Sequence, residues 1–103
     1  MSNYLYPATV ESNNEGGFIA KFRDVPEAIT EAWDLEELKN NARDALISAI
    51  DFYIEDRKAF PVGSTVKSGE IAIELPASVV AKVLLLNTMV QANVRPIAEV
   101  LRF

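Results

Sequence analysis

Two segments in which apolar and polar residues alternate, joined by a glycine-rich turn, constrain the fold of this chain more than any other feature. Residues 12–17 are polar and end in two glycines, and residues 18–22 then place apolar side chains at every second position. Because residues 4–11 alternate in a similar way, the two segments predict an antiparallel hairpin. Pro7 has no backbone N–H to donate to a sheet, so it predicts an edge position or a bulge for the first strand.

A long helix is predicted shortly after the hairpin. Pro26 interrupts the strand pattern, and residues 28–32 then predict a short third strand. Asp34 suits the N-cap, Glu37 completes a capping box, and apolar spacing typical of a helix continues to about Asp56. The apolar residues that recur every three or four positions, and that we expect to be buried, are Leu35, Leu38, Ala42, Ala45, Leu46, Ala49 and Tyr53.

The rest of the chain predicts one more strand and a helical segment. Residues 70–75 alternate strictly, and because a helix precedes them we expect a parallel crossover in the sheet. Pro76 suits the first position of a helix over residues 77–92. The predicted fold class is therefore α/β (α+β), in the order β-β-β-α-β, with residues 1–75 as the α/β domain and residues 76–103 as a helical segment.

The composition excludes several classes of function. The chain of 103 residues is one domain, or one domain with a small appendage, and it holds no cysteine and no histidine. This excludes disulfides, thiolate metal sites and serine–histidine or cysteine–histidine catalysis within the chain, and we expect no enzyme activity, cofactor or metal. There is no secretory signal, and Lys82 interrupts the longest apolar stretch, residues 79–86, so we expect a cytoplasmic protein.

The net charge of −5 is distributed unevenly along the chain. Residues 1–56 carry a net charge of −8, and residues 57–103 carry +3. An acidic surface attracts a basic partner and repels nucleic acid, so the first part of the chain favours a basic protein as its partner. The second part has six dispersed cations, which form a weak footprint for DNA.

Acidic side chains around the second and third predicted strands are the first candidate site. Asp24, Glu27 and Glu31 could hold magnesium in a nuclease. Nothing in their spacing requires a metal, however, and we interpret them as solvated turn residues.

The start of the long helix is the second candidate site. Glu36 and Glu37 complement the helix dipole, and they could also form a docking patch for a basic protein. Trp33, just before the cap, is either an interface residue or a hydrophobic staple that folds back on Leu38 or on nearby apolar residues. The sequence leaves both alternatives open.

The helix predicted over residues 77–92 is apolar over so wide an arc that it indicates burial against a second partner, with another subunit as one candidate. The residues that we expect at a dimer interface are Val83, Leu86, Met89 and Val90. A turn and the start of a further helix follow. They form either a helical hairpin or part of a DNA-binding helix–turn–helix, with Arg95 and Arg102 as the DNA contacts.

Several motifs, taken together and in this order, resemble the HicB antitoxin family. These are G-G-F at residues 16–18, F-R-D-V-P-E-A-I-T at 22–30, D-L-E-E at 34–37, A-R-D-A-L at 42–46, L-P-A-S at 75–78 and K-V-L-L-L-N at 82–87. The resemblance covers nearly the whole chain.

The resemblance implies a partial ribonuclease H-like fold without nuclease activity. It also implies a toxin partner of the HicA type, a small basic mRNA interferase that cleaves RNA with a catalytic histidine, and homodimers or higher oligomers that repress their own operon. We therefore expect an antitoxin that inhibits this toxin by masking its RNA-binding surface. The alternatives are an autorepressor that binds operator DNA and, less favoured, a metal-dependent nuclease. The residues expected to contact the toxin are Asp24, Glu27, Trp33, Glu36 and Glu37.

The chain departs from the family pattern at two places. Just before the helix the family usually has glycine, an acidic residue and then serine or threonine, where this chain has Ala32, Trp33 and Asp34. Residues 94–103 resemble the second helix of the family's helix–turn–helix, and the sequence stops there. We expect either a shortened form of the protein or a variant with weakened binding to operator DNA.

Overall fold

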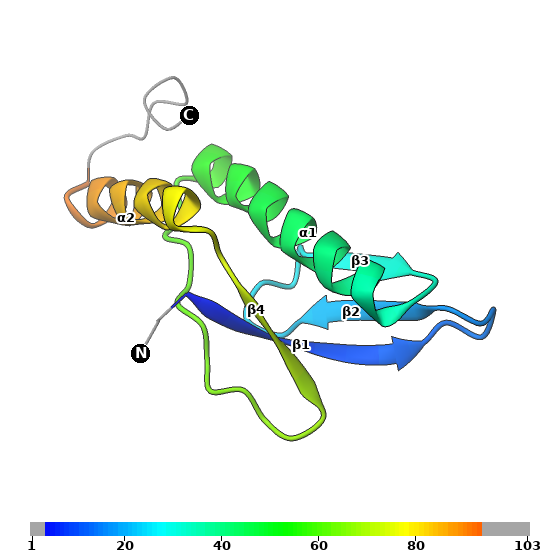
Figure 1. Cartoon of the computed structure of the whole chain (residues 1–103). Helices are drawn as coiled ribbons and strands as arrows, with labels where there is room; N and C mark the ends of the chain where they lie inside the picture. The colour runs from blue at the N-terminus through cyan, green and yellow to red at the C-terminus, as the bar shows by residue number, and fades with distance from the viewer. Residues whose placement is uncertain (1–3, 94–103) are drawn as a thin grey trace.

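A four-stranded sheet with two helices over one of its faces makes up the fold (Figure 1). The computed structural model describes residues 4–93. The elements in chain order are β1 (Leu5–Ser12), β2 (Phe18–Phe22), β3 (Ile29–Ala32), α1 (Leu35–Asp56), β4 (Glu70–Glu74) and α2 (Ala77–Gln91). The mixed α/β class and the predicted order of elements are confirmed. The likeness to ribonuclease H stays a prediction.

The predicted hairpin forms around a side-chain hydrogen-bond bridge in its turn. Asn13 Oδ1 accepts from the backbone N–H groups of Glu15 and Gly17, both at 2.9 Å. Gly16 lies in the left-handed region with φ 93°, where glycine carries no steric penalty. The turn joins β1 to β2 in a regular antiparallel ladder that runs from Ala8 opposite Phe22 to Ser12 opposite Phe18.

The expected parallel crossover is wrong, because every pair of neighbouring strands in the sheet is antiparallel. The strand order is β3-β2-β1-β4, and β4 pairs with β1 so that Tyr6 lies opposite Ile73. The cause is the connection over residues 57–69, which runs back along the sheet after α1 and reverses the chain once more (Figure 1). Thr65 and Ser64 hold this connection in place through hydrogen bonds with Arg23 and Asp24.

The edge position or bulge predicted from Pro7 is also wrong, because β1 is an interior strand without a break in its register. Leu75 N–H donates to the Tyr4 carbonyl at 3.0 Å, so even-numbered residues of β1 bond towards β4 and Pro7 faces the side of β2. The ladder with β2 begins only at Ala8. The missing N–H of Pro7 therefore lies beyond the end of β2, where no strand needs it.

The unpaired edge of β3 is partly covered by α1. The side-chain Nδ2 of Asn41 donates to the backbone carbonyl of Glu31 at 3.1 Å. The Phe22 N–H donates to the Ala28 carbonyl, so even-numbered residues in this part of the chain bond towards β2, and the Glu31 carbonyl faces the side of β3 that has no neighbour in the sheet.

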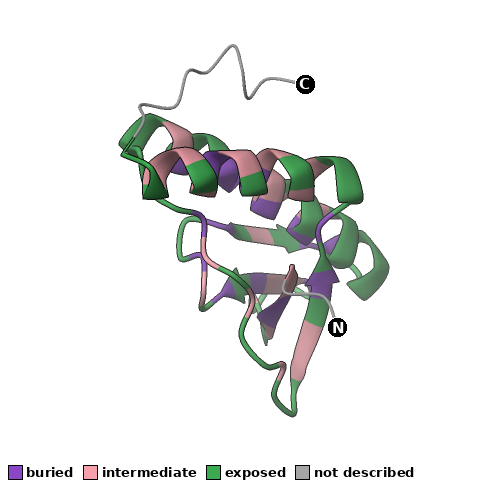
Figure 2. Cartoon of the chain, turned by 90° about the vertical axis from the view of Figure 1, so that its left-hand side faces the viewer, coloured by how far each residue is buried: buried purple, intermediate pink, exposed green. Residues whose placement is uncertain are grey.

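The core lies between the helices and the sheet, where buried residues gather (Figure 2). Most of the predicted helical stripe is confirmed, with three differences. Leu35 is half exposed, Ala45 is only partly buried, and Ile50 is buried although the sequence reading left it out. The α1 residues that the structure buries are Leu38, Ala42, Leu46, Ala49, Ile50 and Tyr53. Leu35 is the first residue of α1, next to the exposed N-cap Asp34.

The second helix belongs to the same core. Val83 and Leu86 are fully buried in it, and Lys82 of α2 lies 3.8 Å from the Asp51 carboxylate of α1. Pro76 is the N-cap rather than the first helical residue. The division at residue 75 remains a prediction, and it would separate β4 from a helix that shares its core. No helix within residues 4–93 combines the length and apolar character needed to cross a membrane.

Candidate functional site

The residues predicted to contact a partner form two separate groups in the structure. Trp33, Glu36 and Glu37 lie at the junction of β3 and α1. Asp24 and Glu27 lie in the connection between β2 and β3, at the other end of β3. The two groups are therefore described separately below.

At the β3–α1 junction, the predicted cap forms with one difference in its bonding. Asp34 Oδ1 accepts from the Glu37 N–H at 2.8 Å, as a capping box requires. The return bond shifts by one residue, because Glu37 Oε1 accepts from the N–H of Trp33 at 3.4 Å and not from that of Asp34. The helix start thus fixes the backbone of Trp33 directly.

Trp33 is largely exposed, with 65% of the surface of the residue accessible. Its ring lies beside Gly17 of the β1–β2 turn, since a Cβ added to Gly17 would come within 3.3 Å of Trp33 Cε3. Leu38, the partner expected for a hydrophobic staple, is fully buried in the core. The exposure of the ring favours the interface alternative over the staple.

A small hollow of about 150 Å³ opens beside the Trp33 ring. The residues that line it are Asn13, Glu15, Glu31, Ala32, Trp33 and Glu37. Within residues 4–93, no ion pair engages the carboxylates of Glu15 and Glu31. No lysine or arginine lines the hollow.

Sequence reasoning left Glu15 out of the site, and it considered Glu31 as a metal ligand or, preferably, as a solvated turn residue. The sequence did hold a signal that the Glu31 side chain faces solvent. Successive side chains of a strand point to opposite faces, so Glu31 lies on the face of β3 opposite to that of its neighbour Ala32, which is buried. Glu15 carried no such signal, because only the folded hairpin brings the β1–β2 turn next to the end of β3.

At the other end of β3, Asp24 is engaged inside the molecule. Its two carboxylate oxygens accept from the backbone N–H and the hydroxyl of Ser64, at 2.8 and 2.6 Å. Arg23 Nη1 lies 3.8 Å away, and the Asp24 side chain is only 14% exposed. Asp24 thus anchors the connection that leads to β4.

Glu27 is exposed but bonded to α1. Its Oε1 accepts from the Tyr53 hydroxyl at 2.8 Å. Burial, together with this hydrogen bond, raises the pKa of Tyr53 to about 12. Among residues 4–93, no group of three or more acidic side chains is placed to hold a metal ion.

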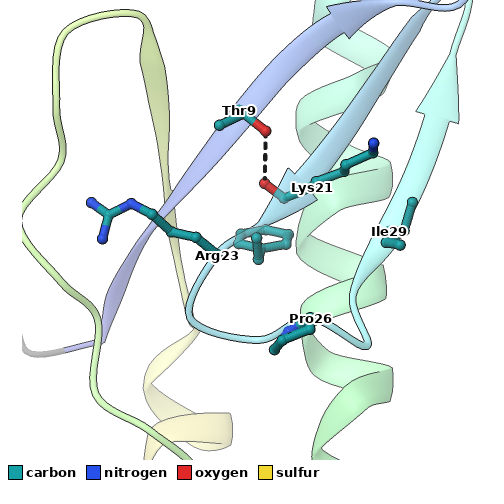
Figure 3. A pocket seen from close by; sticks show the side chains of 6 residues that line it. Thr9, Lys21, Arg23, Pro26 and Ile29 are labelled. Carbon is teal, nitrogen blue, oxygen red and sulfur yellow. Dashed lines mark hydrogen bonds between the residues drawn. The ribbon is translucent and has the colours of Figure 1, made fainter.

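A second hollow, of about 340 Å³, lies on the sheet face away from the helices (Figure 3). Thr9, Lys21 and Ile29 form a row across β1, β2 and β3, because they are direct neighbours in the register. Arg23 and Pro26 complete the wall with Phe22, and the Thr9 hydroxyl donates to the Lys21 carbonyl at 3.3 Å.

The cations beside this second hollow are already paired. Lys21 Nζ lies 3.2 Å from Glu11, and Arg23 Nε donates to Glu70 at 2.9 Å. The Arg23 guanidinium in turn holds the pKa of the Glu70 carboxyl below its usual range. The sequence reading did not identify this hollow, and the exposed Ile29 in an alternating strand was the available signal.

The residues predicted at a dimer interface differ in how far the structure buries them. Val83 and Leu86 are buried inside the chain's own core, so their side chains are not on the surface of α2. Met89 and Val90 are partly buried, and Leu84 is the large apolar residue that α2 exposes, at 51%. Arg95 and Arg102 lie outside the described residues.

Comparisons with known proteins point to one family. The model of a family described as HicB-like antitoxin of bacterial toxin–antitoxin systems matches residues 5–84. Antitoxin HicB of Escherichia coli (strain K12) is 43% identical over 89 residues, which are 86% of this chain and 64% of that protein.

Two further relatives carry the same name. Antitoxin HicB 2 of Photorhabdus laumondii is 49% identical over 91 residues, which are 88% of this chain and 63% of that protein. Antitoxin HicB of Pseudomonas fluorescens is 29% identical over 92 residues, 87% of this chain and 63% of that protein. The chain thus spans less than two thirds of the length of the relatives that it matches.

Proposed function

The chain belongs to the HicB-like antitoxin family, and from this premise we propose that it binds a small basic HicA-type ribonuclease toxin in the cytoplasm and inhibits it. The inhibition is steric and electrostatic, because an acidic protein that covers the RNA-binding surface of a toxin excludes the RNA. The observation that carries the proposal is the exposed Trp33 beside a group of exposed carboxylates at the start of α1.

The charge and chemistry of this surface support a basic protein as its partner. Interface hot spots are enriched in tryptophan, and exposed carboxylates accelerate the association of a protein of opposite charge. Glu36 and Glu37 stand in the first turn of α1, and Glu31 stands on the adjoining strand. Asp24 and Glu27 lie at the other end of β3, outside this surface, and their carboxylates already accept hydrogen bonds from Ser64 and Tyr53.

The experiment measures both binding and inhibition. The full chain is titrated into the toxin by calorimetry, and RNA cleavage by the toxin is followed at the same ratios. We expect a complex and a stoichiometric loss of cleavage. The double variant Glu31→Lys/Glu36→Lys should weaken binding by at least about tenfold.

A variant with the same change in charge elsewhere provides the control. Asp44→Lys/Glu55→Lys alters two exposed acidic residues of α1 outside the β3–α1 junction and should bind nearly as the wild type does. No complex by the wild type would contradict the proposed function. An equal loss in both double variants would contradict only the place of the surface.

We propose in addition that two copies of the chain associate through the exposed side of α2. The support for this is Leu84, which points away from the core while its neighbours Val83 and Leu86 are buried. Val80 lies one helical turn before Leu84, on the same side of the helix.

A further inference from the structure

We propose that the hollow beside Trp33 is a subsite for an arginine side chain of the partner protein, with the guanidinium stacked on the indole and held by the carboxylates of Glu15 and Glu31. This inference rests on the proposed function, since it names the chemistry by which the toxin would be recognised. It concerns the β1–β2 turn and the β3–α1 junction together, and it assigns a role to Glu15, which the sequence reading did not consider.

The size of the hollow fits one side chain. Its volume of about 150 Å³ is well below the roughly 300–1,000 Å³ that is typical of a pocket for a separate small molecule. A shallow site of this size at a protein surface suits the end of a long side chain that another protein inserts. The occupant is therefore sought on a protein partner and not among free metabolites.

The charge of the lining selects a cation. Three of the six residues that line the hollow, Glu15, Glu31 and Glu37, are acidic, and no lysine or arginine lines it. Glu37 gives one oxygen to the Trp33 N–H, whereas no ion pair within residues 4–93 engages Glu15 or Glu31. The partial positive charge of the α1 N-terminus opposes a cation, but Asp34 and the two glutamates of the first turn offset it.

The shape of the site favours arginine over lysine. Gly17 lies against the Trp33 ring, and about two thirds of the surface of Trp33 stays open to a partner. A planar guanidinium stacks on an indole face and offers forked N–H donors, so it can contact the ring and two carboxylates at once. A lysine ammonium is a compact and strongly hydrated charge that satisfies fewer of these groups in one position.

The site is also pre-organised. Asn13 fixes the turn that carries Glu15 and Gly17 by two hydrogen bonds of 2.9 Å, and Glu37 fixes the Trp33 backbone. The turn and the helix start are both held before a partner arrives, so little ordering remains to be done on binding. Pre-organisation of this kind raises affinity by lowering the entropy that binding costs.

The test uses Trp33 itself, because it is the single tryptophan of the chain. Fluorotryptophan incorporated into the full chain gives one fluorine resonance in the NMR spectrum. When the toxin is added, this resonance should shift, and a soluble paramagnetic agent should broaden it less than in the free chain. Trp33→Ala should weaken toxin binding by at least about 30-fold, and Glu15→Gln/Glu31→Gln by about tenfold. Trp33→Phe should retain part of the affinity.

Matched controls separate this subsite from general effects on charge or folding. Phe52→Ala removes another exposed aromatic side chain of α1, and Glu55→Gln removes an exposed carboxylate; both should leave binding unchanged. Circular dichroism and thermal unfolding verify that each variant is folded.

The partner's residue is then identified by double-mutant cycles. Each arginine of the toxin is changed to alanine and to lysine, against wild type and Trp33→Ala. One arginine should couple to Trp33 by about tenfold or more, and lysine should not replace it. A toxin complex in which the Trp33 resonance is unchanged, or in which no arginine couples to Trp33, overturns the subsite alone. Absence of any complex by the wild type overturns the proposed function together with the subsite.

Discussion

Asn87 holds the backbone of Phe60 by two hydrogen bonds. The Phe60 N–H donates to Asn87 Oδ1 at 2.7 Å, and Asn87 Nδ2 donates to the Phe60 carbonyl at 2.9 Å. The Phe60 ring is buried and packs edge-on to the rings of Tyr6 and Tyr53, at centroid distances of 5.8 and 5.0 Å. Phe60 therefore joins the connection after α1 to β1 and α1 through its ring, and to α2 through the Asn87 side chain.

The first prediction concerns this pair of bonds. Asn87→Ala leaves a partly buried N–H and carbonyl of Phe60 without partners, and it should lower the free energy of unfolding by about 3 kcal/mol. Urea unfolding followed by circular dichroism measures the change. Gln91→Ala, an exposed position near the end of the same helix, should change it by less than about 0.5 kcal/mol. Equal stability of Asn87→Ala and wild type would show that water replaces both bonds.

The second prediction concerns the close approach of Gly63 to β1. A Cβ at Gly63 would overlap with the carbonyl of Leu5, which is backbone and cannot rotate away. Gly63→Ala should therefore destabilise the fold by about 2 kcal/mol, as other forms of overpacking do. Ser68→Ala, exposed in the same connection, serves as the control in thermal unfolding. A wild-type melting temperature for Gly63→Ala would mean that the connection can move away from β1.

The third prediction concerns acid and the Arg23–Glu70 pair. The hydrogen bond from Arg23 lowers the pKa of Glu70 from 4.5, so this pair stabilises the fold above pH 4.5 and is lost as the pH falls through the lower, folded-state pKa. Glu70→Gln should be less stable than wild type at pH 7, and the difference should shrink below pH 4.5. Urea unfolding at a series of pH values measures it. A difference that does not change with pH would contradict the role of the charge.

The fourth prediction concerns base and Tyr53. The pKa of Tyr53 in the folded state is raised from 10.0 to about 12. The contribution of Tyr53 to the free energy of unfolding is therefore present in full below pH 10, and it is lost as the pH rises towards 12. Tyr53→Phe should cost about 1 kcal/mol at pH 7 through the lost bond to Glu27, and it should lose less stability between pH 10 and 12 than wild type does. The pKa of Tyr6 is also raised by burial, so some alkaline sensitivity will remain.

The fifth prediction separates two neighbouring leucines of α2. Leu86→Ala removes a fully buried side chain and should lower the free energy of unfolding by about 3 kcal/mol, whatever the state of association. Leu84→Glu changes an exposed residue, and it should shift sedimentation towards the monomer without destabilising the fold. A dimer that Leu84→Glu leaves intact would place the interface between copies elsewhere.

Local rules were sufficient for most of the elements. Asp34 and Glu37 placed the start of α1, and the alternation in residues 18–22 placed β2, because both signals act over a few neighbouring residues. The direction of β4 could not be found in this way. It depends on where residues 57–69 are anchored, and those anchors, Asp24 and Arg23, lie about 40 positions away in the chain.

The candidate site shows the same limit. Trp33 and the acidic start of α1 could be named from the sequence as a candidate docking surface, whereas the exposure of Trp33 and the place of Glu15 depend on how the chain folds. Asp24 was expected to contact the partner because the sequence shows its charge. The sequence does not show its hydrogen bonds to Ser64. Charge alone does not distinguish a carboxylate that is free to bind another protein from a carboxylate that is already hydrogen-bonded within its own chain.

The bond from Asn41 to Glu31 has a consequence for the assembly of this protein. A strand added beside β3 would need the carbonyl of Glu31, and that carbonyl already accepts from α1. Extension of the sheet by a further chain is therefore less hindered at β4, the opposite edge. Growth of the sheet and occupation of the hollow beside Trp33 would therefore take place on different sides of the molecule, so that neither excludes the other.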